Sequence, residues 1–514
     1  MNTPMRLFVI GFISSLFVAP VFASAASFEV TGWIPYWRSA TGTVDVLPHL
    51  DKVTEVNPFV YTLKSDGTLY DNGTIEDTAI WASFNAQAHA KGVRVIPTVM
   101  SGDRDTMHAV LSNTQLRANL VQSIVTLVNT QGHDGIDIDF EFKRAETKDH
   151  FSVFLRELKQ GLGANKWLMC TIETRIPAED RYYGTTIPED AGQYSNDLQQ
   201  INQHCDRVRL MAYDQQGIDL KLRTDAGDRL YAPVGDPAWV EKVVNYMSKD
   251  IDKSKMLIGV PTYGYEYVVT PTPNNKFKYQ YDILWTFNPG YGTQQAAKFN
   301  VTPERAFWGD MAFTYINSDM QTAPVSGTMG ALTAAAAASQ YVAMNNAPVS
   351  FRYVVWPDAQ SMQQKIDLAK RLGVRGISIF KFDGGQDPNM WNVLANAAVK
   401  DPSALPSAPV AGTTTPTPGG NTGVIVGAKF SRTLNLNSVG QDVLTLQKIL
   451  NTDSATRVAT SGAGAPGKET TKLGSLTLAA LKKFQVKHGI AKAGVAGYGT
   501  VGPKTRAKLN TFVQ

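Results

Sequence analysis

The amino-acid sequence predicts an α/β protein: a (β/α)8 TIM barrel with an α/β insertion between strands 7 and 8, followed by a small C-terminal helical domain. Eight strand-like runs follow one another along the chain, most of them preceded by helical patterning. The segment between the last two runs is far too long for an ordinary barrel loop. The chain has 514 residues, 43% hydrophobic and 18% charged, which is ample material for a large core and a second, smaller domain.

The predicted strands are residues 28–35, 53–61, 93–99, 135–141, 167–173, 207–213, 256–263 and 376–382. Apolar residues recur at helical spacing in residues 76–91, 115–130, 148–162 and 361–372. Residues 265–349 are interpreted as the insertion, with a short helix in the alanine-rich run 332–338. Active residues of such barrels lie at the carboxyl ends of the strands, so we expect the functional site there.

The first 25 residues resemble a secretory signal peptide. Arg6 precedes an apolar run, residues 7–21, and Ala23-Ser24-Ala25 forms a cleavage site of small residues before Ala26. The run is short for a membrane span, although an uncleaved anchor is the alternative. We therefore expect a protein that works outside the cytoplasm, secreted or at the cell wall, with no stable membrane insertion after signal cleavage.

The fourth predicted strand carries the most distinctive pattern in the chain. In an extended strand Asp137, Asp139 and Glu141 share one face, whereas the apolar residues between them share the other. A surface strand could alternate in this way with its charges in water, but the turn Asp134-Gly135 follows a helical segment, as in parallel sheets whose strands are buried on both faces. Neighbouring buried carboxylates cannot all ionise, so the pKa of at least one should be raised. A glycosidase needs such a protonated acid for its leaving oxygen.

Two further groups of residues fit a sugar site. The sixth strand ends in Met211-Ala212-Tyr213-Asp214, where the Tyr213 hydroxyl can donate a hydrogen bond to an oxygen that becomes charged in the transition state. Aromatic residues stand at other strand ends, and flat rings stack on pyranose faces, although packing in the core is the alternative. The substrate-binding residues that we expect are Tyr36, Trp37, Tyr61, Asp134, Met211, Asp214, Tyr263 and Phe380.

These motifs resemble those of family 18 glycoside hydrolases, the chitinase-like enzymes. Asp134, Asp137, Asp139 and Glu141 fill the DxxDxDxE signature, residues 211–214 resemble its M-x-Y-D motif, and residues 351–361 and 376–391 resemble the branch that contains spore-cortex-lytic and related wall enzymes. The family usually has a tryptophan at the position of Phe380. A phenylalanine there keeps a flat apolar floor but lacks the indole N–H.

The resemblance implies retention of configuration through substrate assistance, without an enzyme nucleophile. Glu141 would protonate the glycosidic oxygen while the N-acetyl oxygen of the sugar attacks the anomeric carbon. Asp139 would orient the acetamide, Asp137 would share its proton, and Tyr213 would hydrogen-bond the acetamide oxygen. We expect no metal and no cofactor, since no Cys/His cluster has metal-ligand spacing. Cys170 and Cys205 could form one disulfide or remain two buried thiols.

The last part of the chain differs in composition from the rest. Residues 401–428 are rich in Pro, Thr and Gly and are interpreted as a linker between a catalytic barrel, residues 26–400, and a domain at 429–514. That domain has helical patterns at 436–450 and 476–488 and a final motif in 494–510, and it resembles the small peptidoglycan-binding domain, with a generic helical bundle as the alternative. It contains thirteen Lys or Arg and three acids, which gives it a charge of +10. Since the whole chain has a charge of +4, the rest of the chain has a charge of −6.

Together these observations predict a secreted glycosidase that cleaves β-1,4 bonds beside N-acetylglucosamine in bacterial peptidoglycan. The alternatives are a secreted chitinase and a catalytically inactive barrel that binds carbohydrate. The expected partner is peptidoglycan or a chitin-like N-acetylglucosamine polymer, without nucleic acid, and we expect a monomer.

Overall fold

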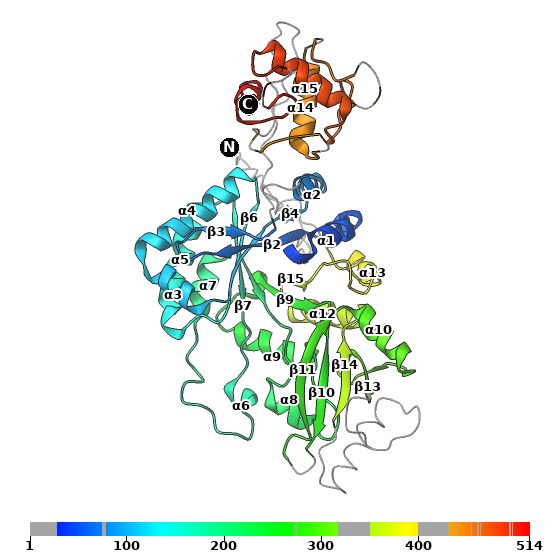
Figure 1. The fold of residues 1–514 in the computed structure, drawn as a ribbon. Helices are drawn as coiled ribbons and strands as arrows, with labels where there is room; N and C mark the ends of the chain where they lie inside the picture. The colour runs from blue at the N-terminus through cyan, green and yellow to red at the C-terminus, as the bar shows by residue number, and fades with distance from the viewer. Residues whose placement is uncertain are drawn as a thin grey trace, which may run out of the picture.

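A computed structural model describes residues 28–73, 79–272, 275–316 and 350–398, and residues 430–513 except 431, 437, 454, 460–461, 463, 493–494 and 496 (Figure 1). The predicted signal peptide, the linker 401–428 and the alanine-rich run lie outside these residues. No helix in the described ranges combines the length and the apolar character that a membrane crossing requires.

Eight parallel strands close into a barrel, as predicted. In order around it they are β1 (Glu29–Pro35), β2 (Glu55–Leu63), β5 (Thr98–Ser101), β6 (Gly135–Phe140), β7 (Trp167–Ile172), β8 (Arg207–Leu210), β9 (Met256–Pro261) and β15 (Gly376–Phe380). The last strand, β15, pairs in parallel with β1 through Glu29 and Gly376, and β1 pairs with β2, which closes the ring.

Two predicted strands are shorter or interrupted in the structure. The third is divided into β4 (Arg94–Val95) and β5, because Pro97 between them has no N–H to donate to a neighbouring strand. The sixth, β8, ends at Leu210, so residues 211–214 form a loop at the carboxyl end of the barrel. A short strand, β3 (Leu69–Asp71), pairs back onto β2.

Helices surround the barrel (Figure 1). They are η1 (Tyr36–Arg38), α1 (Ser39–Val46), η2 (Leu47–Lys52), α2 (Ala79–Ala90), α3 (Arg104–Ser112), α4 (Thr114–Thr130), η3 (Ala145–Thr147), α5 (Lys148–Leu162), α6 (Ala178–Arg181), α7 (Leu198–His204), α8 (Leu220–Asp225), α9 (Pro237–Met247), η4 (Lys253–Lys255), α12 (Ala359–Leu372) and α13 (Met390–Ala395). In α5 a stripe of phenylalanines and leucines is buried, and Phe154 stacks on Phe140 of β6 at 5.9 Å. This packing fixes the outer face of the strand that carries the acids.

The insertion is confirmed and is an antiparallel sheet of five strands in the order β11-β10-β14-β13-β12. These strands are β10 (Gly264–Pro271), β11 (Tyr279–Phe287), β12 (Glu304–Arg305), β13 (Met311–Tyr315) and β14 (Phe351–Trp356), with α10 (Pro289–Lys298) beside them. The insertion extends to Trp356, beyond the predicted limit at residue 349, because β14 pairs with both β10 and β13.

The C-terminal domain has an apolar cluster of its own, which includes Phe430, Leu446, Leu481 and Leu509. Its helices are α14 (Gln441–Asn451), α15 (Ser475–Lys487), α16 (Pro503–Leu509) and η6 (Asn510–Phe512). The glutamine of each repeated L-Q or F-Q pair is buried and holds a loop. Gln447 donates to the Thr477 hydroxyl at 2.9 Å, and Gln485 donates to the Thr500 carbonyl at 2.8 Å.

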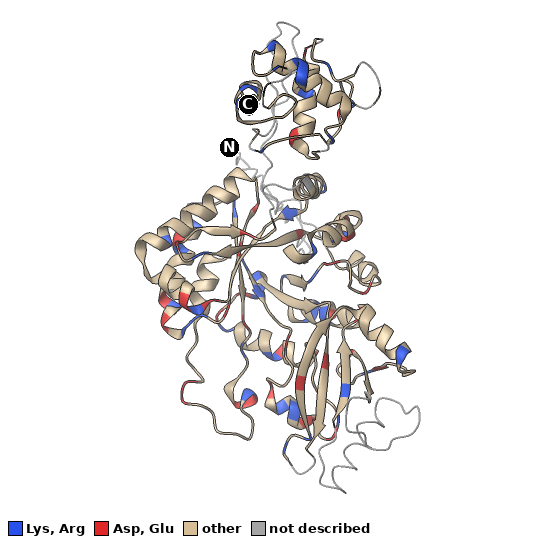
Figure 2. Ribbon diagram, viewed as in Figure 1, with Lys and Arg blue, Asp and Glu red and all other residues tan. Residues whose placement is uncertain are grey.

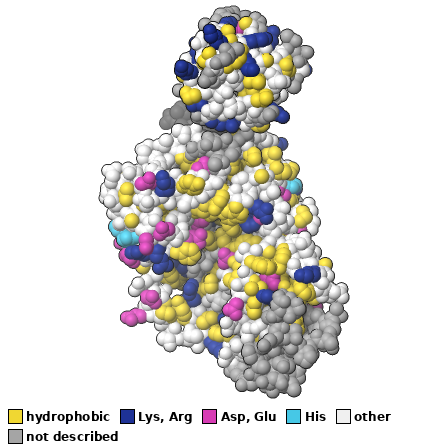
Figure 3. All heavy atoms as spheres, in the orientation of Figure 1, with side chains coloured by type: hydrophobic (Ala, Val, Ile, Leu, Met, Phe, Trp, Pro, Cys, Tyr) yellow, Lys and Arg dark blue, Asp and Glu magenta, His cyan; other side chains and the backbone are white. Residues whose placement is uncertain are grey.

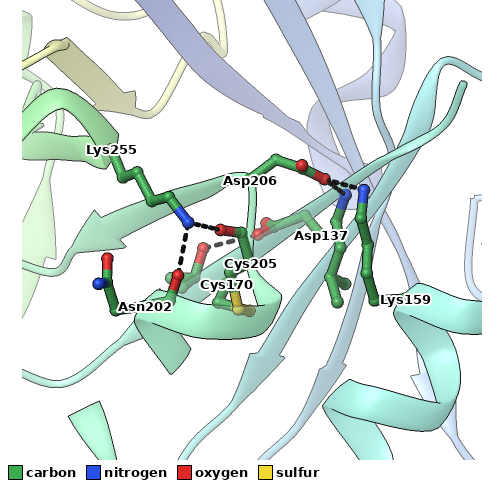
Figure 4. The surroundings of a disulfide bond; sticks show 9 residues. Asp137, Lys159, Cys170, Asn202, Cys205, Asp206 and Lys255 are labelled. Carbon is green, nitrogen blue, oxygen red and sulfur yellow. Dashed lines mark hydrogen bonds and ion pairs between the residues drawn. A yellow bond between two sulfur atoms is a disulfide. The ribbon is translucent and has the colours of Figure 1, made fainter. Parts of the chain in front are cut away.

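Cys170 of β7 and Cys205, which follows α7, form a disulfide. This settles the alternative that the sequence left open (Figure 4). Around it, Lys159 donates to the Asp206 carboxylate at 2.6 Å, and Lys255 donates to the Cys205 carbonyl at 3.1 Å. The segment before β8 is therefore tied covalently and by hydrogen bonds to the neighbouring elements.

A buried ion network fills the centre of the barrel. Arg209 of β8 pairs with Asp137 at 2.8 Å and with Glu55 of β2, and all three side chains are fully buried. Removing one partner of a buried pair leaves the other charge without compensation in a region of low dielectric constant.

We predict that Arg209→Met lowers the free energy of unfolding by about 3–5 kcal/mol, because Asp137 then loses its cation. Urea denaturation followed by circular dichroism would measure the change. The matched control is Arg371→Met, since Arg371 pairs with Glu241 on the surface and should contribute little. Equal destabilisation by both substitutions would contradict the importance of the buried pair.

Candidate active site

Strand β6 carries the candidate acids to the carboxyl end of the barrel. Asp137 and Asp139 are buried on the inner face of the strand, and Glu141 follows its last residue and is partly buried. In register, Asp139 lies beside Met100 of β5 and Thr171 of β7. The structure therefore brings the three predicted acids onto one side of one strand, rising from the centre of the barrel to its mouth.

Asp137, the deepest acid, is surrounded by donors. Its carboxylate accepts hydrogen bonds from the Thr98 hydroxyl at 2.7 Å, the Thr171 hydroxyl at 2.9 Å and the Trp33 indole at 3.2 Å, besides the ion pair with Arg209. These partners hold it in place below Asp139. The sharing of a proton between the two aspartates stays a prediction.

The pKa values of Asp139 and Glu141 are both raised. Burial, followed by the charges of Glu141, Asp137 and Glu173, raises the pKa of Asp139 well above its usual value. Burial and the nearby Glu173 raise the pKa of Glu141 as well. A carboxyl group with a raised pKa at the mouth of a barrel has the property required of an acid that protonates a leaving oxygen.

Two charged residues of this site were missed from the sequence. Glu173, directly after β7, accepts from the Phe142 N–H at 2.9 Å and from Asn196 at 2.8 Å, and it faces Glu141. Lys143 is buried, donates to the Phe140 carbonyl, and burial lowers its pKa. Its ammonium opposes the raised pKa values of the acids. Each lies outside the acidic motif, and the strand-end position of Glu173 was the available signal.

An aromatic floor lies next to the acids. The ring of Phe380, the last residue of β15, stacks on Tyr213 at 5.8 Å and meets Tyr263, Trp33 and Phe59 edge-on at about 6 Å. Burial and nearby carboxylates raise the pKa of Tyr213 well above its usual value, so its hydroxyl stays protonated and can donate a hydrogen bond.

A pocket of about 460 Å³ opens beside this floor. Trp37, Asp214, Tyr263 and Phe380, four of the predicted binding residues, line it together. The Tyr263 hydroxyl donates to Asp214 at 2.5 Å. Figure 3 shows hydrophobic and acidic side chains together in the hollow between the barrel and the insertion.

The remaining predicted aromatic and sulfur-containing residues have different positions. Tyr36 is exposed and touches Trp37 edge-on at 4.9 Å, at the rim. Met211 is partly buried against the tyrosines of the insertion. Tyr61 is only 1% exposed and belongs to the core, so the predicted role as a subsite wall does not fit its position. The Tyr61 side chain packs in the hydrophobic core. The sequence pattern of β2 did not distinguish such a core residue from one that faces the cleft.

Asp134 lies at the other end of the barrel, so its assignment to substrate binding was wrong. It precedes β6, whereas Glu141 follows it, and seven residues of strand span roughly 23 Å. Its carboxylate accepts from the Val95 N–H at 2.7 Å and contacts His89 at 2.9 Å. Asp134 thus connects the start of β6 to the end of α2 and to β4. Among the described residues, no group of three or more His, Cys, Asp or Glu side chains is arranged to hold a metal ion.

A (β/α)8 barrel with paired acids of raised pKa beside an aromatic pocket is the arrangement expected of a glycosidase. The sequence profile described as "Glycosyl hydrolases family 18" matches residues 30–385, which is well over half of the chain. The protein therefore belongs to glycosyl hydrolase family 18.

Relatives and a solved structure agree with this membership. The chain is 29% identical over 226 residues to the putative sporulation-specific glycosylase YdhD of Bacillus subtilis (strain 168), over 43% of this chain and 48% of that protein. The chain thus spans about half the length of that relative. It is 23% identical over 354 residues to a cortical fragment-lytic enzyme of Bacillus anthracis, covering 66% and 68%. The crystal structure of the Bacillus cereus spore cortex-lytic enzyme SleL has the same fold, with a TM-score of 0.54, 18% identity and coverage of 73% and 75%.

We predict opposite shifts of the alkaline limb of the pH profile of kcat/KM for two substitutions around Glu141. The Glu173 carboxylate raises the pKa of Glu141, so Glu173→Gln should lower that pKa and make activity fall at a lower pH. The Lys143 ammonium lowers the same pKa, so Lys143→Met should move the limb to higher pH.

Glu146→Gln is the control, because it removes an exposed acid outside the site. Its pH profile should match that of the wild type. An unchanged limb in both test variants, or shifts in the same direction, would show that Glu141 is not the titrating acid.

Proposed function

We propose that the protein is a secreted hydrolase that cleaves β-1,4 bonds beside N-acetylglucosamine in bacterial peptidoglycan, with retention of configuration. The observation that carries this proposal is the arrangement of Asp139 and Glu141, two carboxyl groups of raised pKa, next to the protonated Tyr213 hydroxyl. This arrangement suits a sugar whose own acetamide acts as nucleophile.

The proposed reaction divides the work among these groups. Glu141, at the mouth of the barrel, donates its proton to the glycosidic oxygen as the bond to the anomeric carbon breaks. The acetamide oxygen attacks that carbon, and Tyr213 and Asp139 hold the acetamide. Within the described part of the chain, the buried Oδ1 of Asp139 has no hydrogen-bond partner, so it is free to accept the acetamide N–H. Glu141, now ionised, takes a proton from the water that opens the cyclic intermediate.

The C-terminal domain supports peptidoglycan as the substrate. Its charge of +10 suits an anionic wall polymer, and Figure 2 shows basic residues on α15. A pocket of about 530 Å³ is lined by Lys482, Lys483, Lys487 and Tyr498. The Lys482 ammonium lies 5.3 Å from the Tyr498 ring, so cationic and stacking groups face the same space. Such a pocket fits a sugar chain that carries acidic groups.

The extracytoplasmic location is also part of this proposal. The Cys170–Cys205 disulfide supports it, since disulfides persist in oxidising compartments. A secreted chitinase is the second candidate, favoured by the neutral aromatic floor around Phe380. The acid at Glu141 argues against an inactive carbohydrate-binding barrel.

We predict that purified peptidoglycan digested with the protein gains reducing ends at N-acetylglucosamine, measured by mass spectrometry. Glu141→Gln should lower the rate by ~10²–10⁴-fold, because the amide fills the same space but supplies no proton. De-N-acetylated wall should be a poor substrate.

The Glu146→Gln variant again serves as the control and should retain full activity. New reducing ends at muramic acid would refute the proposed bond specificity. Equal cleavage of acetylated and deacetylated glycan would rule out substrate assistance.

We predict that a shortened chain ending near Asp401 keeps full activity on soluble N-acetylglucosamine oligomers but loses ~10²-fold on insoluble wall, because it lacks the tether. The apolar cluster of residues 430–513 is separate, so its removal should leave the barrel folded. Parallel pull-downs of residues 429–514 on peptidoglycan and on chitin give the complementary measurement. Retention on chitin alone would favour the chitinase.

A further inference from the structure

A second pocket, of about 590 Å³, lies on the insertion next to the candidate active site. It is bounded by α8, by β10 and β11, and by the loop that follows β8. The lining residues that matter to its chemistry are Gln216, Arg223, Tyr267, Lys276, Phe277 and Tyr281. All of them are described residues, and none of the residues that line the pocket is acidic.

The two pockets follow each other along the same two segments of chain. Asp214 and Tyr265 line the active-site pocket, whereas Gln216 and Tyr267, each two residues further on, line the second. The Gln216 side chain is hydrogen-bonded to Tyr265, and the rings of Tyr265 and Tyr267 are 5.7 Å apart. Two residues of strand span roughly 7 Å, so a glycan bound at the acids can extend into the second pocket.

The second pocket offers two cations without acidic partners. Within the described residues, neither Arg223 nor Lys276 forms an ion pair. The Arg223 guanidinium donates to the Tyr279 carbonyl and lies 4.3 Å from the Phe277 ring. The Lys276 ammonium donates to the Tyr183 carbonyl at 2.6 Å. Both side chains are thus held at the pocket by carbonyls and rings, and their charges remain available to an anion.

Lys221 shows how different the surroundings of the pocket are. It lies on the same helix as Arg223, α8, but its ammonium pairs with Asp225 at 2.6 Å and does not line the pocket. Within the described residues, the lack of an acidic partner therefore distinguishes Arg223, which lines the pocket, from Lys221 on the same helix.

We propose that this second pocket is a subsite for a carboxylate carried by peptidoglycan, either of a stem peptide or of the lactyl group of a muramic acid residue without a peptide. The proposal rests on the proposed function and makes it more specific. The carboxylate accepts hydrogen bonds from Arg223 and Lys276 while the sugar ring lies against Tyr281, which is partly buried. Chitin has no acidic group, so the pocket selects peptidoglycan over chitin.

The test compares Arg223→Gln/Lys276→Gln with the wild type on three substrates. These are intact sacculi, glycan strands freed of stem peptides, and neutral N-acetylglucosamine oligomers. On the acidic substrate that carries the bound carboxylate, kcat/KM should fall about tenfold or more, as expected for lost charge-assisted hydrogen bonds. On the neutral oligomers it should not change. The lactyl carboxyl is free on the peptide-free strands, whereas in sacculi it is amide-linked to the stem peptide. A loss on peptide-free strands therefore assigns the lactyl carboxylate, and a loss on sacculi alone assigns a carboxylate of the stem peptide.

Two further variants control for folding and charge. Lys276→Gln alone changes an exposed side chain and should show part of the effect with unchanged thermal stability. Lys221→Gln removes the same charge from the paired lysine of α8 and should behave as the wild type. An equal loss on acidic and neutral substrates, or no loss on either, would overturn the subsite.

A binding measurement separates this subsite from the proposed function. In the Glu141→Gln background, peptide-free muramyl glycan should bind more tightly than a neutral oligomer of equal length, and the double substitution should abolish the difference. If the wild type fails to cut wall, the proposed function is wrong, and this binding comparison still decides the subsite. Equal affinity for both glycans would refute the carboxylate subsite.

Discussion

The burial of an acidic strand face inside the barrel is the constraint on which the site depends. Asp137 is compensated by Arg209 and three further donors, whereas the Lys143 ammonium is the opposing charge near Asp139 and Glu141 above it. Compensation therefore decreases from the centre of the barrel towards its mouth. Because an uncompensated buried carboxylate is costly, the pKa values of the outer acids are raised, which is the property that the chemistry requires of a proton donor.

The insertion and the barrel contribute different properties to the cleft. The barrel supplies acids and the ring of Phe380, which are fixed by parallel strands. The insertion supplies tyrosines on β10 and Lys276 between β10 and β11, and Arg223 of α8 lines the same pocket. A cleft built in this way separates bond cleavage from recognition of the polymer, so the recognition surface can change while the acids stay in place.

Much of the fold followed from local patterns, since alternating strands and helices determine a barrel. The acids and the residues of the aromatic pocket were also predictable, because strand ends meet at one edge. Tyr61 and Asp134 were misassigned for physical reasons. The Tyr61 ring packs in the core, and Asp134 precedes β6, so the length of that strand separates it from Glu141 at the other end. Glu173 was recognisable by its position at the end of β7, whereas its proximity to Glu141 on another strand depends on the three-dimensional structure, as does the burial of Lys143.

The Cys170–Cys205 disulfide has a consequence for the acids that it does not touch. It closes a loop with a sequence separation of 35 residues, worth about 4 kcal/mol in the chain-entropy description. The strand it clamps, β7, also carries Thr171, which holds Asp137, and leads into Glu173, which faces Glu141. The redox state of the surroundings is thereby coupled to the alignment of the proton donor. In the oxidised chain the disulfide helps to fix the positions of the acids, whereas in a reduced chain non-covalent contacts alone must fix them.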